Sequence, residues 1–483
     1  MAAPRTHFLR RLMLGVTTLT AVALAVASPA TAGVPAQSAD SFVDSVGVNV
    51  HLGYTDTAYG QFGQIRQKLD ELGVRYVRDG ISQGRPDVYS EFRTLAGDGI
   101  KLDAIVGDPL QRWGVGPLDQ QLDLIDRELG PAVASLEGPN EYDIQGDPNW
   151  VASLRDYQRK LWEGAHARPG LASLPIVGPS FVNRDSRELV GDISAWTSEG
   201  NMHPYPGGEA PDQDSHMNDE LALAAKNTGS EPVEATETGY TNAVNATSGQ
   251  LPASEQATGI YMPRLYLDDF RRGISRTFAY ELVDQQNDPG RADVESNFGL
   301  LHNDFTPKPA FTAMSRLIGL LSDPGPSFTP GSLSYSVDGA PSNLRQLLLQ
   351  KRDGTFYLAL WKQESVWNPQ TLTEADPAAS QVTVRLRQPI QRAEVYEPNR
   401  SSSALSTVSS PSAISLPVSA QVEVIHLVPG TQQAAPEPAR EAAPEPALET
   451  EPAPEAEAAP SPEPAPTPTP VSDPESAPAE PAP

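Results

Sequence analysis

Cysteine is absent from this chain of 483 residues, so neither a disulfide bond nor a thiol can contribute to its stability or its chemistry. Positive charge is scarce as well: 35 lysines and arginines stand against 62 aspartates and glutamates, and the formal net charge is −27. An acidic chain of this kind is repelled by nucleic acid and by an anionic membrane surface. We therefore expect no nucleic-acid partner, and a neutral or cationic partner fits the composition better.

The sequence also lacks the motifs of several common active sites. Its seven histidines are scattered, with no pair at the spacing of metal ligands, and Asp143 with Asp147 supplies too few ligands for a calcium loop. No G-x-S-x-G elbow follows an expected strand, which disfavours a serine hydrolase. No glycine-rich nucleotide loop follows the first expected strand either. We expect neither a metal nor a cofactor.

A marked apolar stretch lies near the N-terminus. A basic segment with three arginines precedes the apolar stretch 12–26, which is too short to span a bilayer comfortably, and residues 30–32 read Ala-Thr-Ala. This order is typical of a secretory signal peptide, and we assign residues 1–32 to one that is cleaved after Ala32. No transmembrane segment is expected after cleavage. Secretion without cysteine favours a bacterial protein, of the actinobacterial type or from another bacterium with a cell envelope.

The chain ends in a segment of a different composition. Residues 431–483 consist almost entirely of proline, alanine, glutamate, serine and threonine. Such a segment buries too little apolar surface to offset its ordering entropy, and frequent proline with repeated glutamate keeps it extended. We predict a disordered tail, which serves either as a spacer through a cell envelope or as a solubilising extension.

The body of the chain alternates between short apolar runs and helix-like segments from residue 40 to residue 324. In the helix-like segment 61–72, for example, Ile65, Leu69 and Leu72 recur at helical spacing. Eight strands in alternation with helices match a (β/α)8 TIM barrel in the α/β class, although a doubly wound sheet could use the same alternation. The pattern predicts strands at 45–51, 74–78, 101–106, 133–136, 175–177, 201–203, 232–237 and 276–282, and helices at 61–72, 87–96, 118–129, 150–166, 254–272 and 309–320.

The alternation of expected strands and helices ends after the barrel. Residues 343–350 and 355–361 read as strands that are joined across Asp353-Gly354, a strong hairpin signal. Three further segments between 382 and 425 alternate in polarity along the chain. We predict a small C-terminal antiparallel β-domain, similar to a β-sandwich, over residues 325–430.

Two glutamates occupy the ends of expected strands that lie far apart in the sequence. Glu141 follows Asn140 just past the fourth strand, and Glu237 ends the seventh. In a TIM barrel the active site lies at the C-terminal ends of the strands, so both glutamates would meet at the barrel mouth. Nearby alternatives are Glu137, which precedes a Gly-Pro turn, and Glu234, which strand alternation places on the opposite face from Glu237.

Two facing carboxylates are what glycoside hydrolysis requires. One carboxylic acid protonates the leaving oxygen, while the other carboxylate attacks the anomeric carbon or activates water. A separation of about 5 to 5.5 Å between the carboxyl groups gives retention of configuration, and about 6.5 to 9.5 Å gives inversion. The acid needs a raised pKa, and the nucleophile must stay ionised.

Asn140-Glu141 after the fourth strand, together with Thr236-Glu237-Thr238-Gly239-Tyr240 at the end of the seventh, resembles the retaining (β/α)8 glycoside hydrolases of clan A, the superfamily of cellulases, mannanases and xylanases. The resemblance covers roughly residues 45–320, and the appended β-domain is similar to that of family 39. It implies that Glu141 is the acid/base, that Glu237 is the nucleophile, and that Asn140 binds the sugar 2-hydroxyl.

The resemblance implies further substrate-binding positions. It matches Arg78, late in the second strand, and His203-Pro204-Tyr205 on the sixth. Arg78 would either hold the nucleophile ionised or pair with Asp79, and His203 and Tyr205 would either line the site or pack a loop. Where many clan members have tryptophan on the eighth strand this chain has Tyr280, which is expected to replace it as a sugar-stacking platform.

Two more positions are proposed from their place in the expected barrel. His51 lies near the end of the first strand, where it is a candidate pocket residue. Trp113 lies after the third strand, and its flat apolar ring would either bind a sugar or plug the barrel rim.

These features together predict a secreted retaining glycoside hydrolase that cleaves β-linked oligo- or polysaccharides through a covalent glycosyl-enzyme. One alternative is a non-catalytic carbohydrate-binding protein of the cell envelope on the same barrel. Another is a transglycosylase with the same site, which differs in excluding water at the second step.

Overall fold

The computed structural model describes residues 33–430. The expected signal peptide, residues 1–32, and the expected disordered tail, residues 431–483, lie outside the described residues. Within 33–430, no helix has the length and apolar character needed to cross a membrane.

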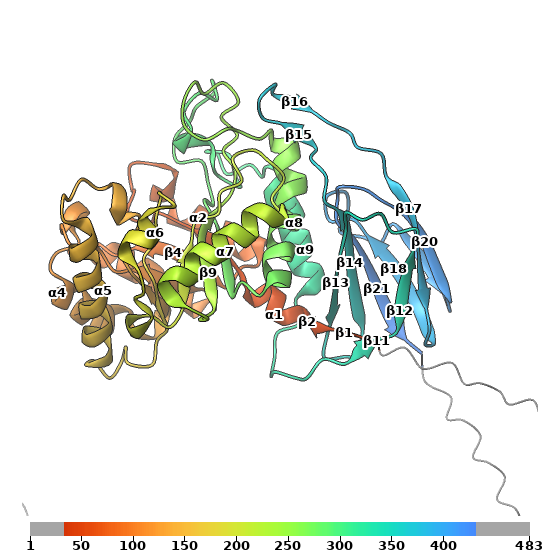
Figure 1. Cartoon of the computed structure of the whole chain (residues 1–483), viewed down its shortest axis with the longest axis horizontal. Coiled ribbons are helices and arrows are strands. Elements are labelled where there is room, and N and C mark those ends of the chain that lie inside the picture. Colours follow the sequence, from red (N-terminus) through yellow and green to blue (C-terminus); the bar gives the residue numbers. More distant parts are fainter. Residues whose placement is uncertain (1–32, 431–483) are drawn as a thin grey trace, which may run out of the picture. The chain divides into compact units, whose positions relative to one another are not determined.

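Eight parallel strands form the core of the larger domain (Figure 1). Their order in the sheet is β7-β6-β5-β4-β3-β10-β9-β8, and a parallel bridge from Val177 to Glu199 closes the ring between β7 and β8. The predicted TIM barrel is thereby confirmed. The strands are β3 (Val46–Asn49), β4 (Tyr76–Gly80), β5 (Lys101–Ile105), β6 (Val133–Glu137), β7 (Ile176–Val177), β8 (Gly200–Met202), β9 (Val233–Thr238) and β10 (Arg276–Ala279).

Helices separate these strands, as α2 (Phe62–Leu72) illustrates. Ile65, Leu69 and Leu72 recur at helical spacing and are buried. Gly73 ends the helix with a φ of 83°, a conformation that glycine adopts without steric cost. The other helices are α1 (Ala39–Asp44), α3 (Pro86–Gly97), α4 (Leu118–Leu124) with a π-helical extension (Ile125–Leu129), α5 (Trp150–His166), α6 (Ser186–Val190), α7 (Asp214–Thr228), α8 (Glu255–Arg272) and α9 (Pro309–Leu321).

Every predicted strand and helix of the barrel is present, with ends that differ by a few residues. The sequence pattern did not predict α6 or α7, which lie between β7 and β9. The inward face of α7 carries Glu220 and Asn227 beside Met217 and Ala224, so its apolar period is weak. The last predicted strand was too long, because β10 ends at Ala279 and the chain then leaves the sheet.

A bulge near the end of β9 changes the direction of its last side chains. Thr277 of β10 pairs with Ala235 of β9. Two residues later Ala279 pairs with Thr238, which lies three residues after Ala235. Strand β9 therefore holds one residue more than its partner over this interval, and such a bulge re-aims the side chains beside it.

The bulge overturns the expectation that Glu234 and Glu237 face opposite sides of the sheet. Glu234 is 1% exposed and accepts a hydrogen bond from Arg276. Burial, followed by the charge of Asp103 on the opposite strand β5, raises the pKa of Glu234 well above its ordinary value. Glu234 thus lies in the barrel interior beneath Glu237, and simple alternation was wrong for this strand.

The C-terminal domain consists of antiparallel strands, as predicted. One sheet has the order β12-β17-β20, and the other has the order β19-β18-β21-β14-β13-β2. Leu348, Val384 and Ile425 belong to a buried core between them. The strands are β11 (Ser332–Leu333), β12 (Tyr335–Asp338), β13 (Leu344–Gln350), β14 (Phe356–Lys362), β15 (Trp367–Asn368), β16 (Thr373–Glu374), β17 (Ser380–Leu386), β18 (Ile390–Tyr396), β19 (Ser406–Ser409), β20 (Ala413–Val418) and β21 (Glu423–Pro429).

The segment before the barrel also belongs to these sheets. Strand β1 (Val34–Pro35) pairs with β11, and β2 (Gln37–Ser38) pairs in parallel with β13. The first described residues are therefore joined to strands that lie some three hundred positions later in the chain.

A buried ion pair of the barrel lies at its contact with the C-terminal domain, beside the helices α8 and α9 that lie between the two (Figure 1). Arg264 of α8 donates to both carboxylate oxygens of Asp212, at 2.6 and 3.3 Å. Trp361 of β14 donates its indole N–H to the same carboxylate at 2.8 Å. The side chains of Arg264 and Asp212 are both fully buried, so each charge depends on its partner.

We expect Asp212→Asn to lower the free energy of unfolding by about 3 kcal/mol, because it leaves the Arg264 charge buried without a counter-ion. Urea unfolding followed by tryptophan fluorescence measures this change. Asp98→Asn is the control, since it breaks an exposed pair with Arg66 that solvent screens, and its loss of stability should be much smaller. Equal losses of unfolding free energy in the two variants would contradict the conclusion that the buried charges of Arg264 and Asp212 depend on each other.

Candidate active site

A cavity of about 420 Å³ opens where the loops that follow the barrel strands meet. Its size falls in the range of small-molecule sites, about 300 to 1,000 Å³. Most of the predicted site residues line it: His51, Arg78, Asn140, Glu141, Tyr205, Glu237 and Tyr280. Trp113 belongs to the turn Arg112–Gly114, but its side chain lies outside the described part of the structure.

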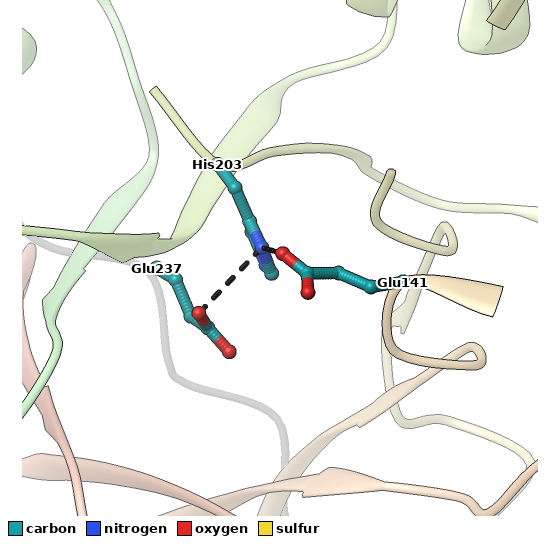
Figure 2. A group of neighbouring side chains, drawn as sticks. All are labelled: Glu141, His203 and Glu237. Carbon is teal, nitrogen blue, oxygen red and sulfur yellow. Dashed lines mark hydrogen bonds and ion pairs between the residues drawn. The ribbon is translucent and has the colours of Figure 1, made fainter. Parts of the chain in front are cut away.

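Glu141 and Glu237 converge on this cavity, with His203 beside both (Figure 2). One oxygen of each carboxylate and one ring nitrogen of His203 all lie within 4.8 Å of one another. Glu141 follows β6 with a φ of 46°, a left-handed conformation that is strained for a residue other than glycine and is common at functional sites. Its backbone N–H donates to the Ser180 hydroxyl at 3.1 Å, which helps to hold this conformation.

Arg78 lies beneath the two carboxylates and is almost completely buried. Each of its five N–H groups has an acceptor. The Nε and one Nη2 proton bond both oxygens of Glu137, at 2.5 and 2.8 Å. The remaining protons bond Asn49, Glu237 and Asn140, at 2.9, 2.7 and 2.7 Å. Arg78 therefore contacts Glu237, one of the two roles that the sequence left open.

Asp79, the other partner considered for Arg78, is held by the backbone instead. Its carboxylate accepts the N–H groups of Leu52 and Gly80 at 2.8 and 2.7 Å. Burial raises the pKa of Asp79 to about 8, and these two hydrogen bonds and the Arg78 charge only partly oppose it. Among the described residues Asp79 makes no ion pair with Arg78.

The surroundings of Glu237 keep its carboxylate ionised. Burial alone would raise its pKa, but the neighbouring charges of His203 and Arg78 and the hydrogen bonds from Tyr205 and Arg78 lower it to about 2. The Tyr205 hydroxyl donates to one oxygen at 2.8 Å, and Arg78 donates to the other at 2.7 Å. A carboxylate held in this way is available as a nucleophile at any ordinary pH.

The surroundings of Glu141 suit the transfer of a proton. One of its oxygens lies 2.8 Å from Nδ1 of His203, whose Nε2 lies 3.0 Å from the Thr236 hydroxyl. That hydroxyl donates toward Asn201 and Glu137, which offer only acceptor atoms at these contacts, so the Nε2 atom of His203 carries the proton. Nδ1 can then accept from a protonated Glu141 or, on an imidazolium ring, donate to its carboxylate.

Glu137, the alternative to Glu141, has a supporting position. Its carboxylate is fully buried and accepts hydrogen bonds from Arg78, Asn201 and Thr236. The chain then passes through a Gly-Pro turn, and Glu141 beyond it lines the cavity. Glu137 is therefore the counter-ion of the buried arginine, and Glu141 is the carboxyl group that a ligand can reach.

Asn140 is oriented by its neighbours. Its side-chain oxygen accepts from Arg78 at 2.7 Å and from the Ser180 hydroxyl at 3.1 Å. The amide NH₂ group is thereby left as the donor at the cavity wall, which is what recognition of a sugar hydroxyl needs.

Tyr280 and His51 form another part of the wall. His51 meets Tyr280 edge-on, with ring centroids 5.4 Å apart. Burial, opposed by the charge of Glu237 and aided by that of Arg78, lowers the pKa of His51 to about 4, so its ring is neutral near pH 7. Glu281, the neighbour of Tyr280, is fully buried and accepts from the Tyr59 hydroxyl at 2.8 Å. Tyr280 is the member of this pair that lines the cavity.

Sequence reasoning missed several residues of the site. Asn201 and Thr236 both donate hydrogen bonds to the Glu137 carboxylate, and Thr236 also donates to Asn201. The Ser180 hydroxyl donates to Asn140 and accepts from the backbone N–H of Glu141. One signal was present for Asn201, which lies two residues before His203 along a strand and therefore points to the same side. Ser180 lies in a loop, where the sequence gives no comparable signal.

The trio of Glu141, His203 and Glu237 is also the one group among residues 33–430 with the composition of a metal site. Two features disfavour a metal ion there. His203 and Glu141 already contact each other at hydrogen-bond distance, and the Arg78 guanidinium beside Glu237 would repel a cation. The donor set fits proton transfer better than metal binding.

The low pKa of Glu237 makes a prediction about stability. Its folded-state value of about 2 lies below the unfolded value of about 4.3, so its ionisation stabilises the fold above pH 4.3 and this contribution is lost as the pH falls toward 2. We expect the difference in unfolding free energy between the unmodified protein and Glu237→Gln to shrink by about 1 kcal/mol between pH 6.5 and pH 3.5. Urea unfolding at both pH values measures it, and a constant difference would show that Glu237 titrates normally.

Comparison with known proteins identifies the fold. No family model and no curated protein sequence matches this chain. Among solved structures, a family 39 glycoside hydrolase from Bacteroides cellulosilyticus aligns with a TM-score of 0.56 at 14% identity, over 82% of this chain and 83% of that one.

Two further structures align over similar lengths. A GH39 enzyme from Xanthomonas axonopodis pv. citri has a TM-score of 0.53 at 14% identity, over 83% of this chain and 96% of its own. A monomeric β-xylosidase from Caulobacter crescentus has a TM-score of 0.52 at 14% identity, over 82% and 98%. The chain therefore has the barrel and β-domain fold of family 39 glycoside hydrolases, the fold that the sequence resemblance implied.

Proposed function

We propose that this protein is a retaining glycoside hydrolase that acts on β-linked oligo- or polysaccharides. The observation that carries the proposal is the pair Glu141 and Glu237, which share one cavity but have different surroundings. Glu237 is held ionised by Arg78 and Tyr205, whereas Glu141 contacts a histidine that can serve either of its protonation states. Pairs of carboxyl groups with unequal surroundings are how glycosidases divide acid and nucleophile roles.

In the first step Glu141 gives its proton to the glycosidic oxygen while an oxygen of Glu237 attacks the anomeric carbon. The bond from that carbon to the leaving oxygen breaks, the alcohol departs, and an ester joins the sugar to Glu237. In the second step Glu141, now a carboxylate, takes a proton from water. The resulting hydroxide attacks the anomeric carbon and releases Glu237. Asn140 would donate its amide N–H to the sugar 2-hydroxyl in both steps.

The spacing of the two carboxylates supports retention. One carboxylate oxygen of Glu141 and one of Glu237 lie within 4.8 Å of each other. This is near the separation of about 5 to 5.5 Å that allows direct attack, and shorter than the 6.5 to 9.5 Å, roughly, that leaves room for a water molecule.

We further propose that the protein is secreted through its N-terminal segment and associates with the cell envelope through its proline-rich tail. Both proposals rest on sequence composition alone. A transglycosylase would use the same residues with a sugar hydroxyl in place of water, so product analysis distinguishes it from a hydrolase.

Trapping of the covalent intermediate tests the nucleophile. We expect the unmodified protein, incubated with a panel of activated 2-deoxy-2-fluoro β-glycosides, to gain the mass of one fluorosugar, because the fluorine slows both steps whereas the activated leaving group speeds only the formation of the ester. Intact-protein mass spectrometry detects the adduct, and peptide mapping should place it on Glu237. Glu237→Ala should gain no mass, while Glu234→Gln, altered at a buried position that does not line the cavity, should still be labelled if it folds. Labelling of Glu237→Ala would refute the assignment.

A change of Glu141 tests the acid/base role. We expect Glu141→Ala to lower kcat/KM by about 10² to 10⁴ on substrates with a poor leaving group. The loss should be much smaller with a 2,4-dinitrophenyl leaving group, which needs no proton, and added azide should restore turnover as a β-glycosyl azide. Equal losses for both leaving groups would assign Glu141 a role in binding or structure instead.

A further inference from the structure

Five rings form a continuous wall along one side of the cavity. Each ring contacts the next: Tyr54 with His51, His51 with Tyr280, Tyr280 with Phe298, and Phe298 with Tyr205, at centroid separations of 4.8, 5.4, 5.3 and 5.8 Å. All five side chains line the cavity. We call this set the aromatic wall.

The two ends of the aromatic wall have different surroundings. At the inner end the Tyr205 hydroxyl donates to Glu237 at 2.8 Å, beside the proposed site of bond cleavage. At the outer end Tyr54 is 49% exposed. The wall therefore leads from the reaction centre to solvent.

Tyr54 has the properties of a binding platform. Its ring lies parallel to His51, with an angle of 8° between the planes, so one face is covered and the other is not occupied by any aromatic ring of the described chain. Its hydroxyl has no hydrogen-bond partner within residues 33–430. Because about half of the Tyr54 surface is exposed, the free protein gains only part of the stabilisation that burial of this side chain could give, and a ligand that covers the ring would gain the rest. A flat apolar face beside a free hydroxyl is suited to the face of a sugar ring.

The backbone holds Tyr54 in place before any ligand binds. Its N–H donates to the carbonyl oxygen of His51 at 2.8 Å. Its own carbonyl oxygen accepts from both the N–H and the hydroxyl of Thr57, at 3.0 and 2.7 Å. These bonds fix the backbone, and stacking on His51 restrains the ring, so Tyr54 loses little conformational freedom on binding, which favours affinity.

The position of Tyr54 relative to the two carboxylates indicates which part of a substrate it would contact. Tyr54 follows β3, and β3 is two strands from β9, which carries Glu237, but three strands from β6, which precedes Glu141. The leaving group lies against the acid/base, and the glycone lies against the nucleophile. The aromatic wall ends at Glu237 and so follows the glycone side.

We propose that Tyr54 binds the second sugar unit on the glycone side. The preferred substrate is then an oligo- or polysaccharide with at least two β-linked units before the scissile bond, rather than a glycoside of a single sugar. The direction assigned to the sugar chain rests on the proposed function. The contact between Tyr54 and a sugar does not, because it can be measured as binding.

Kinetics with matched substrates test the proposal. We would compare 4-nitrophenyl β-glycosides with one and two sugar units in the β-1,4-xylo, β-1,4-gluco and β-1,3-gluco series. Tyr54→Ala should lose about tenfold more kcat/KM on the two-unit substrate than on the one-unit substrate, equivalent to about 1.4 kcal/mol. Tyr54→Phe, which keeps the ring, should lose much less. Leu405→Ala removes an exposed apolar side chain of the C-terminal domain and should leave the ratio of kcat/KM on the two-unit substrate to that on the one-unit substrate unchanged.

An equal loss on both substrates would overturn the proposal, because it would show that Tyr54 only supports His51. Calorimetry separates this result from failure of the proposed function. Tri- and tetrasaccharides of the same three series would be titrated into Glu141→Gln and into the double variant with Tyr54→Ala. A tenfold weaker affinity in the double variant supports the platform even if no bond is cleaved. Unchanged affinity, or no binding to either protein, would overturn it.

Discussion

The site depends on one buried guanidinium group. Arg78 uses all five of its N–H groups, and its acceptors come from three parts of the barrel: Asn49 at the end of β3, Glu137 and Asn140 around the end of β6, and Glu237 in β9. A buried charge that lacks its partners costs several kcal/mol, so these acceptors have to be in place together. The strands of the barrel therefore cannot come together around Arg78 without also placing the residues at the mouth of the barrel.

This constraint also explains why neighbouring carboxyl groups behave differently. Two of the three glutamates near Arg78 are in contact with it, and the third, Glu141, is bound to His203 instead. Glu137 accepts four hydrogen bonds in the interior and has no access to a ligand. Glu237 keeps part of its carboxylate at the cavity and stays charged, whereas Glu141 lies at the same cavity in contact with a ring nitrogen of His203. The same side chain thus serves three purposes because its surroundings differ.

The sequence was sufficient for features that depend on local patterns. Alternating apolar runs predicted the barrel, and the rule that sites lie at strand ends predicted that Glu141 and Glu237 meet at one cavity. Features set by contacts between distant residues were missed. Thr236 reaches Glu137 across 99 positions of the chain, and no local pattern announces that contact. The bulge in β9 depends on the pairing with β10, so the alternation used to choose Glu237 over Glu234 was wrong, although Glu237 does line the cavity and Glu234 does not.

The short strand β2 imposes an order on the folding of the chain. Its residues 37 and 38 pair with residues 349 and 350, so they have no strand partner until the whole barrel has been synthesised. The contact closes a very long loop, and such contacts form slowly because many conformations are lost first. The N-terminal segment can therefore join the C-terminal sheet only after the chain is present as far as residue 350, and a chain that ends before β13 has no strand with which β2 can pair.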